Sequence, residues 1–173
     1  GPTCYAESDD GIHWVRPNLG QVELLGSRNN NALKLTDEPL QMAGVLKDDQ
    51  DPDPQRRYKM VYNPNNGKTW VLRTATSPDG INWTASPHYA TKRFLEISSF
   101  YRHNGLFVVH GQSAESTGGE SGFAQGRQGY ARISTDFDNW LGEEVASFSL
   151  PEPAKAADRG TTKPYDQVHL GMG

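Results

Sequence analysis

The sequence has little of what marks several large classes of protein. Its single cysteine, Cys4, excludes an internal disulfide and a cysteine-based zinc site. No apolar run approaches the length of a membrane span, and no signal peptide is visible. The 17 basic residues are scattered among 21 acidic ones without a run or stripe, so nucleic acid is not an expected partner. Helical periodicity is also missing, which leaves a β-rich fold as the expectation.

The chain is instead rich in residues that form turns. It has 18 Gly and 11 Pro in 173 residues, a density that favours many short strands over long helices. This length suits one domain with a sizeable core and is too short for two comfortable ones. We therefore predict a single all-β unit or part of one.

A short motif occurs three times, as S-x-D-[G/F]-x-x-W. The copies run over residues 8–14, 77–83 and 134–140, and each follows a run that reads as a strand. A serine and an aspartate two residues apart can hydrogen-bond the backbone of a tight turn, while the tryptophan folds back beside the strand. We interpret the repeat as architectural; the alternative is that the tryptophans stack on sugars.

Between the copies lie short segments that we predict to be strands, namely 41–47, 58–62, 70–76, 94–101, 106–110 and 129–133. Three or four antiparallel strands closed by a Trp-bearing turn describe one blade of a β-propeller. The segments divide at about 1–40, 41–90, 91–150 and 151–173, which gives about two complete blades and two halves. Closed propellers have about four blades or more, so we expect a piece of a larger propeller, or one completed by another chain.

Glu96 lies inside an apolar strand that the turn Asn104-Gly105 joins to the next one. Strict alternation would place Glu96 and Phe100 on one face of the sheet and Ile97 on the other. A buried carboxylate has a raised pKa, which is what a general acid needs at neutral pH. The alternative is that Glu96 pairs with an arginine or lies at a wet edge.

Three further segments could carry chemistry. Asp49, Asp51 and Asp53 suggest calcium, but Pro54 replaces the glycine of an EF-hand loop, and a solvated acidic turn with Asp48 or Asp49 facing a site is the favoured interpretation. The Gly-rich stretch 112–128 reads as a lid over a site or as plain surface. His169, on a predicted strand at 165–173, is a site residue or a structural histidine. We expect no metal and no cofactor.

The segments 5–14, 57–62 and 94–112 together resemble the five-bladed β-propeller glycoside hydrolases of the clan of families 32, 43 and 68. In particular, the chain is similar to uncharacterised bacterial proteins described as family-32-like N-terminal propellers. The resemblance implies cleavage of glycosidic bonds in oligo- or polysaccharides, in an extracellular or periplasmic setting. The alternatives are a propeller that binds glycans without cleaving them and one with a structural or assembly role.

The resemblance also implies roles for particular residues. Glu96 matches the general acid of the clan, and Asp48 matches its stabilising aspartate, with Asp49 as a rival. Gln112, Asp166 and His169 would join Asp49 as substrate contacts. The first-blade carboxylate should precede Gly1. Both hydrolytic geometries need two carboxylates, roughly 5 to 9.5 Å apart, so this chain alone is expected to be inactive.

Overall fold

The computed structural model describes residues 2–35, 40–64, 71–91, 95–113, 128–141 and 145–148. In these ranges the chain is all-β, and the one helical element is a single 3-10 turn, η1 (Pro54–Arg56). Asp53 caps this turn, because its carboxylate accepts a hydrogen bond from the backbone N–H of Gln55 at 2.9 Å. The prediction of an all-β fold is confirmed at this level.

Eight strands form two antiparallel four-stranded sheets, and each sheet follows the order of the chain. The first sheet contains β1 (Leu40–Lys47), β2 (Tyr58–Pro64), β3 (Leu72–Ser77) and β4 (Thr84–Thr91). The second contains β5 (Glu96–His103), β6 (Leu106–Ser113), β7 (Gln128–Ser134) and β8 (Val145–Phe148). The described residues do not form a closed ring.

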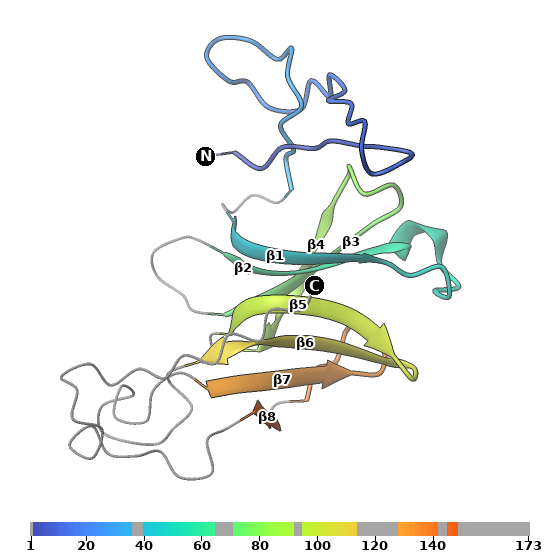
Figure 1. Cartoon of the computed structure of the whole chain (residues 1–173), viewed down its shortest axis with the longest axis vertical. Helices are drawn as coiled ribbons and strands as arrows, with labels where there is room; N and C mark the ends of the chain where they lie inside the picture. Colours follow the sequence, from blue (N-terminus) through green and yellow to red (C-terminus); the bar gives the residue numbers. More distant parts are fainter. Residues whose placement is uncertain are drawn as a thin grey trace, which may run out of the picture.

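The two sheets and the N-terminal segment 2–35 are stacked as three layers, with the first sheet in the middle (Figure 1). The packing explains why β2 is buried along nearly its whole length. Val61 faces the second sheet and packs with Leu95, Phe107 and Val109. Met60 and its neighbour Tyr62 face the other way, toward Leu35 of the N-terminal segment. Coverage on both faces accounts for three successive buried apolar residues in β2, Met60, Val61 and Tyr62.

The first strands of the two sheets, β1 and β5, lie side by side and run in the same direction (Figure 1). Gly44 of β1 contacts β5 closely, since a Cβ at this position would lie 2.7 Å from the Cβ of Phe100. Further along both strands, Asp48 reaches Arg102. Glycine at position 44 is therefore what lets the two strands approach.

The strict alternation predicted along β5 is wrong. The pairing of β5 with β6 shifts register between Ile97 and Ser99, which is the signature of a β-bulge at Ser98. The extra residue turns Ile97 and Phe100 toward the same side, where both approach Gly44. The predicted turn is confirmed: Asn104 and Gly105 have φ angles of 48° and 81°, and positive angles at both central residues are those of a two-residue type I′ hairpin.

The three Ser-Asp turns, residues 8–14, 77–83 and 134–140, share one hydrogen-bond pattern. In the second copy, Ser77 Oγ accepts from the backbone N–H of Gly80 at 2.9 Å, and Asp79 Oδ1 accepts from those of Ile81 and Asn82 at 2.8 Å. The indole N–H of Trp83 donates to the carbonyl of Gly80 at 2.9 Å. The other two copies repeat each of these bonds.

Each turn joins two antiparallel segments, as in β3 and β4. The architectural interpretation of the repeat is thus supported by geometry. Burial raises the pKa of Asp79, but hydrogen bonds from Asn82, Ile81 and Ser77 outweigh it and bring the value to about 2. The equivalent Asp136 also has a pKa of about 2, chiefly because Asn139 donates to its carboxylate.

Candidate functional site

A polar pocket of about 470 Å³ lies where β1 ends beside the turn between β5 and β6. We call it the hairpin pocket. Its lining consists of Leu46, Lys47, Asp48, Asp49, Gln50, Arg102, Asn104 and Gly105. Two residues singled out in the sequence, Asp48 and Asp49, therefore line one cavity, together with an arginine and two amide side chains.

Asp48 is buried and held by two cations from different strands. Its Oδ1 accepts from Arg102 Nη1 at 2.5 Å, and its Oδ2 lies 3.4 Å from Lys59 Nζ. The backbone N–H of Gln50 also donates to Oδ1, at 3.2 Å. A carboxylate with these partners is fixed in place, and it ties β5 of the second sheet to β2 of the first.

Lys59 is the buried centre of this network, with its side chain only 1% exposed. Its ammonium donates to Asp51 Oδ2 at 2.6 Å and to the carbonyl of Arg56 at 2.8 Å. It also lies 5.6 Å from the ring centroid of Phe107 and 5.5 Å from that of Phe137. The ammonium is thus compensated by carboxylates on one side and by two aromatic faces on the other.

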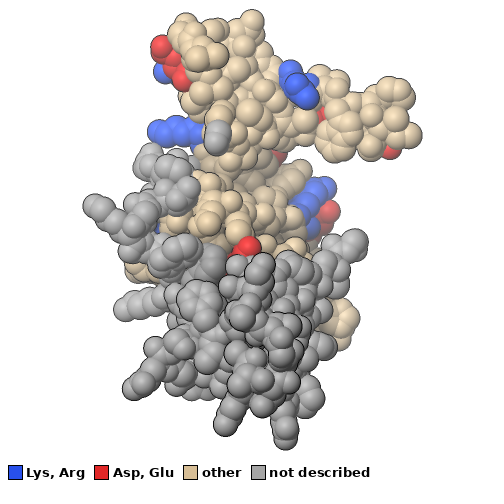
Figure 2. Space-filling view, turned by 60° about the vertical axis from the view of Figure 1, so that its left-hand side comes forward, with Lys and Arg blue, Asp and Glu red and all other residues tan. Residues whose placement is uncertain are grey.

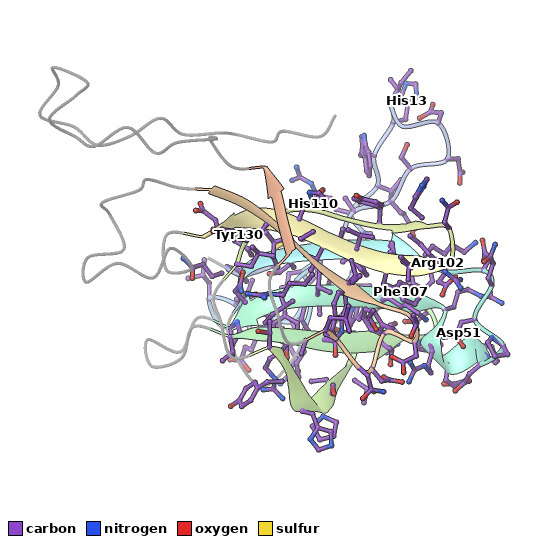
Figure 3. All side chains as sticks on the ribbon, turned by 90° about the horizontal axis from the view of Figure 1, so that it is seen from below. His13, Asp51, Arg102, Phe107, His110 and Tyr130 are labelled. Carbon is purple, nitrogen blue, oxygen red and sulfur yellow. The ribbon has the colours of Figure 1, made fainter. Side chains whose placement is uncertain are left out.

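Phe107 contacts a second cation, because Cζ of Arg102 lies 5.0 Å from its ring centroid. Figure 3 shows Arg102, Phe107 and Asp51 toward one end of the sheets, and His110 and Tyr130 toward the other. The aromatic ring therefore forms a floor beneath the guanidinium of Arg102. The arrangement fixes the cation that pairs with Asp48.

The network continues to the third Ser-Asp turn. Arg56 donates to Asp138 at 2.9 Å and lies 3.5 Å from Asp51. Burial lowers the pKa of Arg56, but the hydrogen bond and the charges of both carboxylates raise it above its usual value. Burial raises the pKa of Asp51, while the hydrogen bond from Lys59 and the backbone N–H of Asp53 bring it below its usual value. Both groups stay charged at neutral pH.

Asp49 differs from Asp48 because its carboxylate is 65% exposed. It lies 3.1 Å from Lys47 Nζ and 3.9 Å from Arg57 Nε, both of which are about half exposed. Such exposed ion pairs contribute little to stability, so a polar group of a ligand can replace either partner. Asp49 is therefore the carboxylate of the hairpin pocket that solutes can reach.

The carboxylates suggested for calcium have separate partners. Asp51 bonds to Lys59, and Asp53 caps η1, while Asp49 points to the pocket side. Across the residues that the structure describes, no three histidine, cysteine or acidic side chains gather as a metal-binding group. Of the two residues named for a solvated acidic turn facing a site, Asp49 is exposed at the hairpin pocket, whereas Asp48 is buried.

Glu96 does not line the hairpin pocket. It begins β5, half-buried, with its backbone opposite that of Gln112. Arg102, which holds Asp48, lies six positions further along β5, a span of about 20 Å at the rise of an extended strand. The described part of the chain therefore places Glu96 and Asp48 near opposite ends of β5 and not in one cavity.

The side chains of the remaining predicted site residues are not among those that the structure describes. Only the backbone of Gln112 is described, as the partner of Glu96. Asp166, His169, and the part of the Gly-rich stretch at 114–127 lie outside the described residues.

Sequence reasoning missed Lys59, Arg102, Phe107 and Asn104. A signal for Lys59 was present, because a lysine inside the apolar run YKMVY poses the same burial problem that drew attention to Glu96. No such signal existed for Arg102, which stands in the sequence as an ordinary residue before a turn. It reaches Asp48 only because β1 and β5 pack together.

The other face of the second sheet carries a smaller polar pair. Tyr101 Oη and His110 Nε2 are 3.1 Å apart, and burial lowers the pKa of His110. His110 is therefore neutral at neutral pH. Neither residue lines the hairpin pocket.

Comparison of the chain with protein-family models, with curated proteins and with solved structures gave no match. In the described ranges, no helix is long and apolar enough to cross a bilayer. The basic side chains visible on the face in Figure 2 stand apart from one another and form no patch there.

Proposed function

We propose that this chain is part of a carbohydrate-active β-propeller whose hairpin pocket binds an oligo- or polysaccharide. Three features support the propeller: sheets in chain order, a Ser-Asp turn between the third and fourth strand of each, and first strands that run side by side. A propeller repeats one four-stranded sheet around a central channel. The described sheets are then two successive blades.

The composition of the hairpin pocket carries the binding part of the proposal. Sugar hydroxyls donate and accept hydrogen bonds at once, so they pair well with carboxylates, amides and guanidinium groups that converge on one cavity. Asp49, Gln50 and Asn104 are exposed and line the pocket beside Arg102. Asp48, locked by Arg102 and Lys59, acts as a support that orients Arg102.

Glycan binding can be tested on the chain itself. Oligosaccharides of defined linkage are titrated and followed by calorimetry and by amide chemical shifts. Asp49→Asn and Asn104→Gly, of which the second keeps the positive φ of the turn, should each weaken binding by about tenfold, which corresponds to roughly 1.4 kcal/mol. Asp9→Asn, at another exposed carboxylate in the N-terminal segment, is the matched control and should bind as the unchanged chain does. Binding that is indifferent to Asp49 and Asn104 contradicts the assignment.

Hydrolysis is a second candidate, and it depends on Glu96. The observation that favours it is position: Glu96 begins the first strand of its sheet, half-buried, next to the first strand of the neighbouring sheet. The second carboxylate would have to be a residue other than Asp48. In a complete protein that cleaves glycosides, Glu96→Gln should abolish turnover and leave binding intact, and unchanged turnover would rule out this role.

The proposed function also suggests a cellular location. A glycan-degrading or glycan-binding propeller would act outside the cell or in the periplasm, where polysaccharides are met. A structural or assembly role is the remaining alternative, and it concerns the surfaces that the two sheets leave uncovered.

A further inference from the structure

The guanidinium of Arg102 uses only part of its capacity for hydrogen bonds. An arginine side chain carries five N–H donors. In the described part of the chain, Nη1 of Arg102 donates to Asp48, Nε is buried without a partner, and Nη2 has no acceptor. The side chain is 27% exposed and lines the hairpin pocket. A charged donor group is therefore left over at this cavity.

Arg102 is also held in one position before any ligand arrives. The buried carboxylate of Asp48 fixes Nη1, and the ring of Phe107 lies 5.0 Å from Cζ. A planar guanidinium that is already oriented loses little conformational entropy when it pairs with an oxyanion. Pairs of this kind are among the stronger hydrogen bonds in proteins, because both partners are charged.

The charges around the hairpin pocket favour an anion. Lys47 and Arg57, both about half exposed, share one carboxylate, that of Asp49. Asp48 is already compensated by Lys59 and Arg102. The ion pairs that connect to the pocket among the described residues join the cations Lys47, Arg56, Arg57, Lys59 and Arg102 to the carboxylates Asp48, Asp49, Asp51 and Asp138. This ion-pair network thus carries one more cation than carboxylates.

We propose that the hairpin pocket recognises an acidic glycan, whose sugar residue carries an oxyanion in the form of a uronic acid carboxylate or a sulfate ester. The oxyanion pairs with the guanidinium of Arg102 and the ammonium of Lys47, while Asp49 accepts hydrogen bonds from sugar hydroxyls. A neutral sugar would leave the free donors of Arg102 without a charged acceptor. The inference rests on the proposed glycan binding and narrows its substrate class.

Matched trisaccharides test the need for a negative charge. Trigalacturonate is compared with its methyl ester, which keeps the sugar ring and removes the charge, and sulfated galactotriose is compared with plain galactotriose. Each is titrated into the whole chain by calorimetry. At least one acidic ligand should bind about tenfold more tightly than its neutral counterpart, and added salt should reduce this difference. The acid that binds more tightly identifies the oxyanion.

Variants of the chain test which cations are responsible. Lys47→Met should weaken binding of the preferred acid at least about threefold and leave binding of its neutral counterpart unchanged. Arg102→Lys keeps a positive charge beside Asp48 but lacks the second nitrogen, and it should weaken binding of the acid about tenfold. Urea unfolding confirms that each variant is folded. Lys34→Met, at an exposed lysine that does not line the pocket, is the matched control and should bind within about twofold of the unchanged chain.

The outcomes separate this inference from the proposed function. If acidic and neutral trisaccharides bind equally and all depend on Asp49, glycan binding stands and the preference for an acid is wrong. A preference for an acid that survives both Lys47→Met and Arg102→Lys also overturns the inference, because the charge is then read elsewhere. If none of the four trisaccharides binds, glycan binding at this pocket is itself wrong.

Discussion

Phe137 occupies a backbone position that glycine holds in the other two Ser-Asp turns. Its φ is 70°, close to the 73° of Gly11 and the 78° of Gly80, and a side chain in this left-handed region is strained. The ring is fully buried, with centroids 5.3 Å from Phe107 and 5.9 Å from Phe100, and it covers Lys59. The chain therefore accepts strain at this turn in return for packing between the sheets.

This balance predicts an unusual order of stability. Removing a buried phenylalanine ring costs about 3–5 kcal/mol, so Phe137→Ala should lose about this much and keep the strained backbone. Phe137→Gly loses the same ring but regains about 1–2 kcal/mol of strain, because glycine adopts positive φ freely. We expect a loss of about 1–4 kcal/mol for glycine. At ordinary positions the order is reversed, with glycine the less stable by roughly 0.5–1 kcal/mol.

Urea unfolding followed by the fluorescence of the four tryptophans measures the difference. The slope of the unfolding free energy against urea concentration should be the same for the unchanged chain and both variants. The midpoints of the three unfolding curves then report stability directly. If Phe137→Gly is less stable than Phe137→Ala, the strain argument is wrong. If both lie within about 1 kcal/mol of the unchanged chain, the packing argument is wrong.

Two further predictions concern charge. Lys59→Met leaves the buried Asp48 and Asp51 with fewer cations and should lower the free energy of unfolding by about 3–5 kcal/mol in the same assay. Lys47→Met removes a cation from an exposed pair and should cost at most about 1 kcal/mol. Equal losses for the two variants would show that burial of the ion pair does not matter. The pKa of about 2 for Asp79 and Asp136 lies below the ordinary 3.8, so their stabilisation is present above that value and is lost as the pH falls toward 2. Asp136→Asn should flatten the dependence of the melting temperature on pH in this window, and an unchanged pH profile contradicts the assignment.

The sequence alone determined the local structure that depends on neighbouring residues. The Ser-Asp turns follow from side chains that bond to backbone groups two or three residues away, and the hairpin turn follows from Asn104-Gly105, which adopts positive φ readily. The short strands between these turns were also predictable in kind, because they are bounded by turn residues and carry apolar side chains. Strand ends and the bulge at Ser98 were not, because they depend on the partner strand.

Tertiary structure decided which charged residues meet. Asp48 and Glu96 look like equivalent candidates in the sequence, yet β1 and β5 run in the same direction, so a residue that ends one strand lies far from a residue that begins the other. The same packing brings Arg102 to Asp48 and places the Lys59 ammonium over two phenylalanine rings. Pairing between residues that are remote in the chain depends on how whole sheets stack, and no local pattern encodes that.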